Sequence, residues 1–170
     1  RRGTAVVGHV AAAVRAALGE DVEFARQPEQ LGTGHALAQA ESLAKDADHL
    51  LVLNAAIPLI SAATVANLML QHAEEESDLT FLTAHVDDAR GLGRVRRDRR
   101  GRVTGVVEEA DADPAARAAT EVNVGVYCFR ARWLWPRLAR IPKSAVGEYY
   151  LTDLIAMAIG EGATVLAVPA

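Results

Sequence analysis

The sequence predicts an α/β fold, a Rossmann-like mixed, mostly parallel sheet flanked by helices. Short runs of β-branched and aliphatic residues alternate with longer segments of helical periodicity along the whole chain, as they do where helices connect the strands of one sheet. The apolar run 50–53 shows no polar alternation, which is typical of a parallel strand covered on both faces. In segment 33–44 the apolar residues recur at helical spacing.

Eight segments have the composition of strands. Two of them, 94–97 and 102–107, are expected to form a hairpin, because the turn between them has Gly101 where a positive φ is needed. Acidic residues flank the arginines of this hairpin on both sides, which favours a solvated hairpin over a phosphate-binding patch. The expected strands are residues 4–7, 22–25, 50–53, 79–85, 94–97, 102–107, 121–129 and 163–168.

Local signals mark the ends of several helices. Ser61 is a good N-cap, and Asp113 followed by Pro114 is an N-cap with proline at the first helical position. Gly19 is expected to close the first helix, and Pro136 to bend or end a later one. The expected helices are residues 11–18, 33–44, a helix from Ser61 to the glutamates 74–76, a short one after Pro114, 131–138 and 148–159.

Length and composition indicate one domain that covers residues 1–170. With 51% hydrophobic and 24% charged residues the chain can build one core, and 170 residues are too few for two comfortable ones. A net charge of −4 offers no attraction for nucleic acid, and no apolar run approaches the length of a membrane span. The single cysteine, Cys128, lies in an apolar run and is expected to be buried and inert, which fits a reducing, cytoplasmic location.

Residues 27–36 join a strand to a helix, which is where open α/β sheets bind ligands. Gly32 and Gly34 would let the backbone approach a ligand closely, and free N–H groups at the helix start attract negative charge or carbonyl oxygens. Glutamines in the segment carry both donors and acceptors, which suits them to the edge of a base. The alternative is an ordinary turn capped by Thr33.

A dinucleotide-binding oxidoreductase is the rival interpretation of this loop, and it fails on two points. Leu37 stands where the third glycine of the G-x-G-x-x-G pattern would permit close packing of helix on strand. The acid that binds the ribose should end the next strand, and Asn54 stands there instead.

Six segments, in sequence order and with matching spacing, together resemble the bacterial N-acetylglucosamine-1-phosphate uridyltransferases, within the sugar-1-phosphate nucleotidyltransferases. They are residues 27–36, 53–60, 91–94, 106–109, 121–125 and 148–153. The resemblance implies a nucleotide-diphospho-sugar transferase type of sheet. It also implies uridylyl transfer from UTP to N-acetylglucosamine 1-phosphate, with Mg²⁺, to give pyrophosphate and UDP-N-acetylglucosamine, a cell-wall precursor.

The resemblance also implies site residues. Those that would hold the uracil are Gln27, Gly32 and Thr33. Those that would hold the sugar, its N-acetyl group and its phosphate end are Gly93, Glu108, Asn123, Tyr150 and Thr152.

Plain alternatives exist for three of the implied sugar residues. Glu108 could be an ordinary surface acid beside Glu109. Asn123 lies among valines, so its amide must face a cleft or have a buried partner. Tyr150 follows another tyrosine in an expected helix, where two adjacent residues cannot both face the core, so one of them is free for a ligand.

The sequence departs from the family pattern at the metal site. Where the family has Tyr-Gly-Asp before a Val-Pro-Leu-Ile segment, this chain has Asn54, Ala55 and Ala56, and the methyl group of Ala56 cannot coordinate Mg²⁺. A lysine and a threonine usual in the family are replaced by Ala110 and Val124.

The chain also begins after the family's glycine-rich phosphate loop, without an initiator methionine, and stops before its second metal ligand. The β-helical acetyltransferase domain of the bifunctional members is absent as well. We therefore expect an N-terminally truncated sheet that exposes strand edges at 4–7 and 50–53, with low stability or self-association as the result. Two hypotheses follow, a uridyltransferase with impaired catalysis and a non-catalytic nucleotide-sugar-binding relative or inactive fragment.

Overall fold

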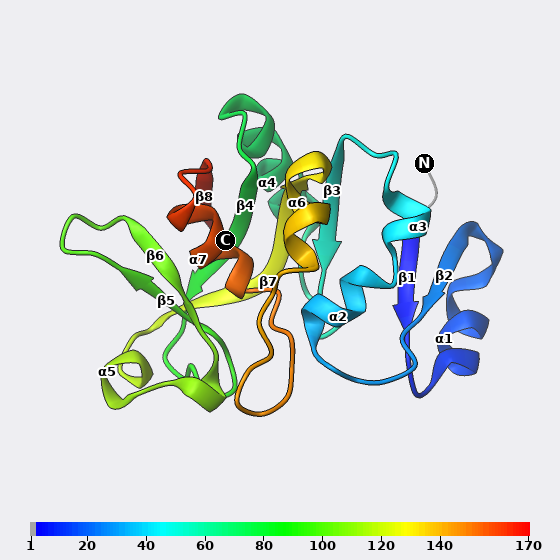
Figure 1. Ribbon diagram of the computed structural model, residues 1–170, viewed down its shortest axis with the longest axis horizontal. Coiled ribbons are helices and arrows are strands. Elements are labelled where there is room, and N and C mark those ends of the chain that lie inside the picture. Colours follow the sequence, from blue (N-terminus) through cyan, green and yellow to red (C-terminus); the bar gives the residue numbers. More distant parts are fainter. Residues whose placement is uncertain (1–2) are drawn as a thin grey trace. The chain divides into compact units, whose positions relative to one another are not determined.

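The computed structural model describes residues 3–170, which divide into two compact units (Figure 1). The first unit runs to Asp48 and includes Trp135–Leu151, and the second comprises His49–Leu134 and Thr152–Ala170. Helix α6 (Ala131–Leu138) carries the chain from the second unit back into the first, with Pro136 inside it. No helix among the described residues is long and apolar enough to cross a membrane.

The first unit is built on a parallel pair of strands, β1 and β2, in which Gly3 is opposite Val22 and Val7 is opposite Arg26. Val7 and Ala25 are its buried strand residues. The elements of this unit are β1 (Gly3–Val7), α1 (Ala11–Leu18), the 3-10 turn η1 (Gly19–Asp21), β2 (Val22–Arg26), α2 (Thr33–Ala38) and α3 (Glu41–Ala44).

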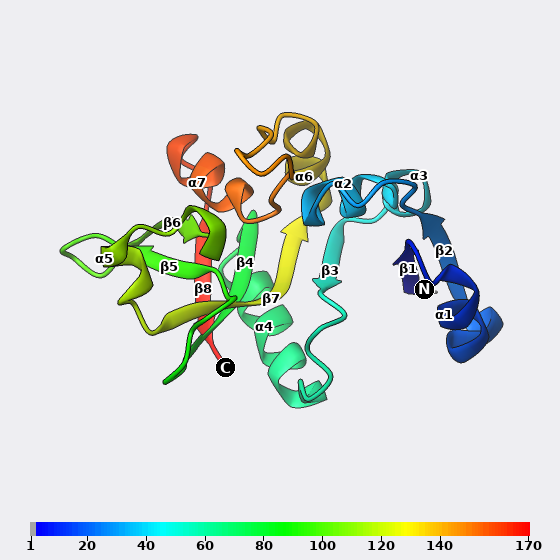
Figure 2. The same ribbon diagram turned by 90° about the horizontal axis from the view of Figure 1, so that it is seen from below.

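The second unit is a six-stranded sheet in which β7 is central. Its strand order is β6-β5-β7-β4-β8, and β3 pairs with β7 as well. Helix α4 lies on one face of this sheet and α7 on the other (Figures 1 and 2). The elements are β3 (His49–Leu53), α4 (Ala62–Glu74), β4 (Leu79–His85), β5 (Arg94–Arg97), β6 (Val103–Val107), η2 (Glu109–Asp111), α5 (Pro114–Arg117), β7 (Glu121–Arg130), α7 (Asp153–Gly160) and β8 (Val165–Pro169).

One hydrophobic core cluster of the second unit lies between α4 and the sheet. Leu68 from the helix is fully buried against three strands, which contribute Leu82, Val126, Cys128 and Val168. Burial raises the pKa of the Cys128 thiol to about 11, so the thiol stays protonated at neutral pH, as expected for an inert cysteine.

The mixed α/β class predicted from the sequence is confirmed, but the predicted excess of parallel pairs is wrong. Within residues 3–170 two strand pairs are parallel, β1 with β2 and β4 with β8, and four are antiparallel. Three of the antiparallel pairs involve β7, which runs opposite to β3, β4 and β5, and the fourth is the β5–β6 hairpin.

Three local predictions are wrong, each for its own reason. The strand around 50–53 is not covered on both faces, because in β3 the side chains of Leu51 and Leu53 are 37% and 45% exposed. The predicted helix 33–44 breaks between α2 and α3, where Gln39 and Ala40 form tight turns. The last helix begins at Asp153 rather than at 148, because Tyr149 and Leu151 are hydrogen-bonded to residues 31–34.

Candidate functional site

The loop between β2 and α2 is held against residues 149–151 by a run of hydrogen bonds within the first unit. The amide of Tyr149 donates to the carbonyl of Leu31 at 2.8 Å, and the amide of Gly34 donates to the carbonyl of Tyr149, also at 2.8 Å. The hydroxyl of Thr33 accepts a third bond from the amide of Leu151 at 3.0 Å. This pairing gives the loop a fixed backbone conformation.

Gly32 permits this pairing to form. Its φ is +96°, and an added Cβ would lie 2.7 Å from the carbonyl oxygen of Tyr149 and 2.9 Å from its nitrogen. Side chains other than glycine's are therefore excluded by backbone atoms, which cannot rotate away. We expected Gly32 to let a ligand approach closely, whereas in the structure it lets another segment of the chain approach.

The side chain of Gln27 is held by hydrogen bonds within the same loop. Its side-chain nitrogen donates to the carbonyl of Gly32 at 3.2 Å and lies 3.1 Å from Nδ1 of His35. His35 is in turn contacted by the side chain of Gln39, one turn further along α2. The three predicted uracil residues are thus brought together, and Tyr150, predicted to contact the sugar, lies beside them in the segment paired with the loop.

The other four predicted sugar residues lie together in the second unit. The hydroxyl of Thr152 donates to Oε1 of Glu108 at 2.7 Å, although 44 residues separate the two. An added Cβ on Gly93 would lie 3.2 Å from Oε2 of the same carboxylate. Gly93 also accepts a backbone hydrogen bond from Asn123 at 2.9 Å.

The side chain of Asn123 is fixed by buried partners. Its nitrogen donates to the hydroxyl of Tyr127 at 2.7 Å, and its oxygen accepts from the amide of Gly125 at 3.2 Å. Burial raises the pKa of the Tyr127 phenol above its usual value, so this hydroxyl stays neutral. The buried partner that the sequence required for Asn123 is therefore Tyr127, which the sequence placed only in an apolar run.

Several carboxylates are gathered near Glu108. Asp153 opens α7 directly after Thr152, and its pKa is raised, chiefly by burial and then by the charges of Glu108 and Asp111. These groups disfavour additional negative charge nearby, so they suit hydroxyl groups of a ligand better than its phosphates.

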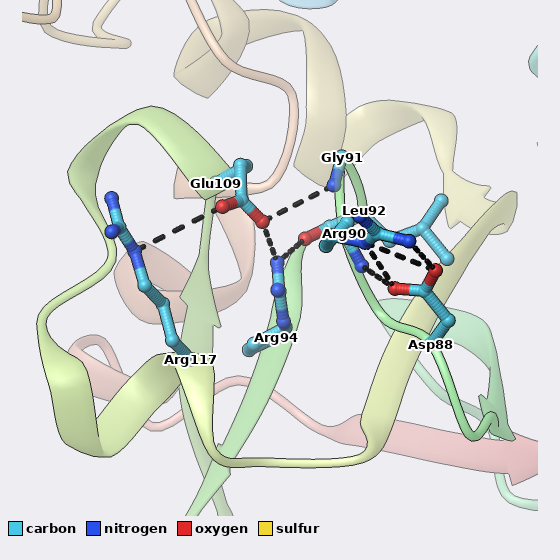
Figure 3. Close-up of polar contacts among 7 residues, drawn as sticks. All are labelled: Asp88, Arg90, Gly91, Leu92, Arg94, Glu109 and Arg117. Carbon is cyan, nitrogen blue, oxygen red and sulfur yellow. Dashed lines mark hydrogen bonds and ion pairs between the residues drawn. The ribbon is translucent and has the colours of Figure 1, made fainter.

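A buried arginine joins the two segments that carry Gly93 and Glu108 (Figure 3). Nη1 of Arg94 is 2.5 Å from Oε2 of Glu109, and the Arg94 side chain is 3% exposed. The same nitrogen donates to the carbonyl of Leu92, and the amide of Gly91 donates to Glu109 at 3.2 Å. The Arg94 guanidinium and this amide hold the pKa of Glu109 below its usual range. Sequence reasoning missed this network, although Arg94 directly follows a predicted site residue.

The segment after β3 does not fit a magnesium ion. Ala56 lies exposed in a turn and offers a methyl group where the implied carboxylate would stand. The neighbouring Asn54 is bonded through its backbone to Gly125 at 2.9 Å. Within residues 3–170, no three His, Cys, Asp or Glu side chains converge as metal ligands would.

Comparison with known proteins shows the class to which this fold belongs. The fold is similar to that of a UDP-glucose pyrophosphorylase solved with UDP-glucose, with a TM-score of 0.72 and 11% identity over 98% of this chain and 72% of that one. A family model described as nucleotidyl transferase matches residues 10–170. The chain belongs to this nucleotidyl transferase family.

Among individual members of the family, the chain is similar to bifunctional GlmU proteins. The bifunctional protein GlmU of Brevibacillus brevis is 47% identical over 152 residues, which cover 88% of this chain and 33% of the relative. The GlmU protein of Exiguobacterium sibiricum is 41% identical over 168 residues, which cover 98% of this chain and 37% of the relative. The chain therefore spans about a third of the length of these curated relatives.

Proposed function

We propose that this chain is the nucleotide- and sugar-recognising part of a UTP-dependent sugar-1-phosphate nucleotidyltransferase, and that its two units belong to one such domain. The proposed reaction joins UTP and N-acetylglucosamine 1-phosphate into UDP-N-acetylglucosamine and pyrophosphate, in the cytoplasm. Identities of 41–47% to GlmU proteins support it over other members of the family.

The observation that carries the proposal is the cluster around Glu108. A carboxylate held by Thr152 at 2.7 Å, next to a residue without a side chain, can accept hydrogen bonds from sugar hydroxyls. The fixed amide of Asn123 is the third polar group of the cluster. We assign the sugar to these residues, Gly93 and Tyr150, and the uracil to Gln27, Gly32 and Thr33.

Ala56 leads us to propose that catalysis by this chain is impaired. In the proposed reaction the sugar phosphate attacks the α-phosphorus of UTP, and a metal ion that neutralises the developing charge normally lowers the barrier by several kcal/mol. The family's Mg²⁺ would lack its carboxylate at Ala56. The second candidate function is therefore a non-catalytic nucleotide-sugar-binding protein.

A calorimetric or ligand-observed NMR titration with UDP-N-acetylglucosamine tests the proposal. We expect a Kd on the order of 0.1–1 mM, about −4 to −5.5 kcal/mol, unchanged by Mg²⁺. Gln27→Ala or Glu108→Ala should each weaken binding roughly tenfold, because each removes a hydrogen bond worth on the order of 1 kcal/mol. Arg99→Ala, at the exposed tip of the β5–β6 hairpin, is the matched control and should bind as the wild type does.

Each outcome of this titration decides between stated alternatives. No binding at all would overturn the assignment of both sites. Binding that strengthens markedly with Mg²⁺ would mean that the chain supplies a metal ligand other than residue 56. Pyrophosphate release from UTP and N-acetylglucosamine 1-phosphate, measured in parallel, should stay at background, and metal-dependent release would overturn the impairment.

A further inference from the structure

The ion pair between Arg94 and Glu109 lies beside the cluster around Glu108 and is not among the proposed ligand-binding residues. Arg94 follows Gly93 in the chain, and Glu109 follows Glu108, so each member of the pair is the neighbour of a proposed sugar residue. The contact between Arg94 Nη1 and Glu109 Oε2, 2.5 Å long, therefore links the two segments that present the proposed site.

The arginine also sets the orientation of one peptide group. Its Nη1 donates to the carbonyl of Leu92, and the peptide between Leu92 and Gly93 is trans. Because a trans peptide is planar, holding the carbonyl on the side of the arginine turns the N–H of Gly93 to the opposite side. Gly93 has no side chain, so this N–H is the donor that it can present to a ligand.

Glu109 also holds the loop formed by residues 91–94. Its Oε2 accepts from the amide of Gly91 at 3.2 Å, and its Oε1 lies 3.9 Å from Nε of Arg117 (Figure 3). The loop is thus held at the Gly91 amide, at the Leu92 carbonyl and at the Arg94 side chain. Movement of the Glu109 backbone would shift its neighbour Glu108 directly.

Stability alone does not explain a buried arginine here. Its side chain is 3% exposed, and its Nε is buried without a hydrogen-bond partner among the described residues. Desolvating a guanidinium offsets much of the attraction to its partner, so buried ion pairs contribute little net stability compared with apolar residues of similar size. What the pair does provide is a fixed direction, since a guanidinium bonds only partners that lie near its plane.

We propose that Arg94 and Glu109 are positioning residues, which hold the Gly93 amide and the Glu108 carboxylate in the arrangement that recognises the sugar. This inference rests on the proposed function, and it predicts that the affinity for the sugar depends on two residues that do not touch it.

The test compares UDP-N-acetylglucosamine with UDP, which lacks the sugar, on Arg94→Met, Glu109→Gln and the double variant. Each should weaken UDP-N-acetylglucosamine about tenfold and change UDP less than about twofold, since hydrogen bonds to the sugar are lost and those to uridine are kept. In the double variant no unpaired charge remains at the buried Arg94 position, so its unfolding midpoint should recover relative to Arg94→Met while its sugar affinity stays low. Arg96→Met is the matched control, because Arg96 lies on the same strand and pairs with the exposed Asp113 at 2.9 Å.

The Gly93 amide signal in an NMR spectrum provides a readout that needs no ligand. It should shift in Arg94→Met and Glu109→Gln and stay in place in Arg96→Met. Equal weakening of UDP and UDP-N-acetylglucosamine, sugar affinity that returns with stability in the double variant, or a Gly93 signal that does not move would overturn the positioning role. A wild type that binds no UDP-N-acetylglucosamine would overturn the proposed function itself, and the Gly93 signal would still decide whether Arg94 orients that amide.

Discussion

Two separate features require glycine at position 32: the positive φ of Gly32 and the close approach of the Tyr149 backbone. Gly101, in the β5–β6 turn, has a similar φ of +78° but no atom within 4 Å of an added Cβ. Comparing alanine variants of these two glycines therefore separates the cost of the backbone strain from the cost of the steric contact. Gly101→Ala should lower the free energy of unfolding by about 1 kcal/mol, the cost of a left-handed conformation.

Gly32→Ala should lower it further, by on the order of 3 kcal/mol in total, because the loop must also move away from Tyr149. Urea unfolding of the two variants and the wild type measures both losses. Equal losses for the two variants would mean that the contact between the loop and residues 149–151 contributes nothing to stability.

His72 gives the second unit a dependence on pH. It is 3% exposed on α4, its Nδ1 lies 2.8 Å from the hydroxyl of Thr80, and its Nε2 lies 3.0 Å from Nδ1 of His49. Burial, followed by the charges of His49 and Arg130, lowers the pKa of His72 to about 4. The folded state thus favours the neutral imidazole.

The sign of the effect follows from this lowered pKa. Above the unfolded pKa of about 6.5 neither state binds the proton, and the stabilisation is complete. As the pH falls from about 6.5 to about 4 only the unfolded state binds it, so stability falls by up to about 3 kcal/mol. His72→Gln, which does not titrate, should lose less stability over this range. The control His85→Gln, at an exposed histidine, should behave as the wild type does. Parallel pH profiles for wild type and His72→Gln would contradict the assignment.

At the scale of elements, the start of α4 depends on one hydroxyl. Ser61 has extended backbone, and its Oγ accepts from the amide of Thr64 at 3.0 Å. Ser61→Ala leaves this amide without its cap and should lower the free energy of unfolding by about 1 kcal/mol. Ser61→Asp keeps an acceptor and adds a negative charge at the helix N-terminus, so it should retain wild-type stability or exceed it. Thermal unfolding of both variants tests the cap, and equal losses in the two would contradict it.

Elements whose ends are set locally were predictable from the sequence. Ser61 and Asp113 cap the helices that they were expected to cap, and Gly101 adopts the positive φ expected in its turn. Residues 148–152 were mistaken for helix because their conformation depends on hydrogen bonds to residues more than 100 positions earlier, such as that from Leu151 to Thr33. Helical periodicity cannot reveal such a constraint.

In the candidate site, too, features with a local sequence signal were predictable and those set by distant contacts were not. The residues of the Glu108 cluster were predicted by resemblance, and they lie on separate segments that only the fold brings together. Their fixing partners were not predictable. Tyr127 lies in an apolar run, and no local pattern around Glu109 indicates that Arg94, 15 residues earlier, is its partner. The role of such residues depends on tertiary contacts, which leave no local pattern.

At the scale of the whole molecule, the similarity to GlmU proteins covers 88–98% of this chain and about a third of those relatives. Within that span strand β3 is the most exposed member of its sheet. Among residues 3–170 it pairs with β7 alone, and Leu51 and Leu53 are 37% and 45% exposed. The 95% exposed Leu59, shortly after the strand, adds to the exposed apolar surface.

An open strand edge with apolar side chains favours pairing with another chain, so we predict that this protein self-associates in a concentration-dependent way. Sedimentation velocity between about 10 μM and about 1 mM, a range in which exposed strand edges associate, should show an increasing weight-average mass. Leu53→Lys should reduce the association, because a lysine on an edge strand resists pairing. Leu70→Lys is the matched control, since Leu70 is 56% exposed but lies on α4. A chain that stays monomeric throughout, or an equal effect of the two lysines, would show that the β3 edge does not drive association.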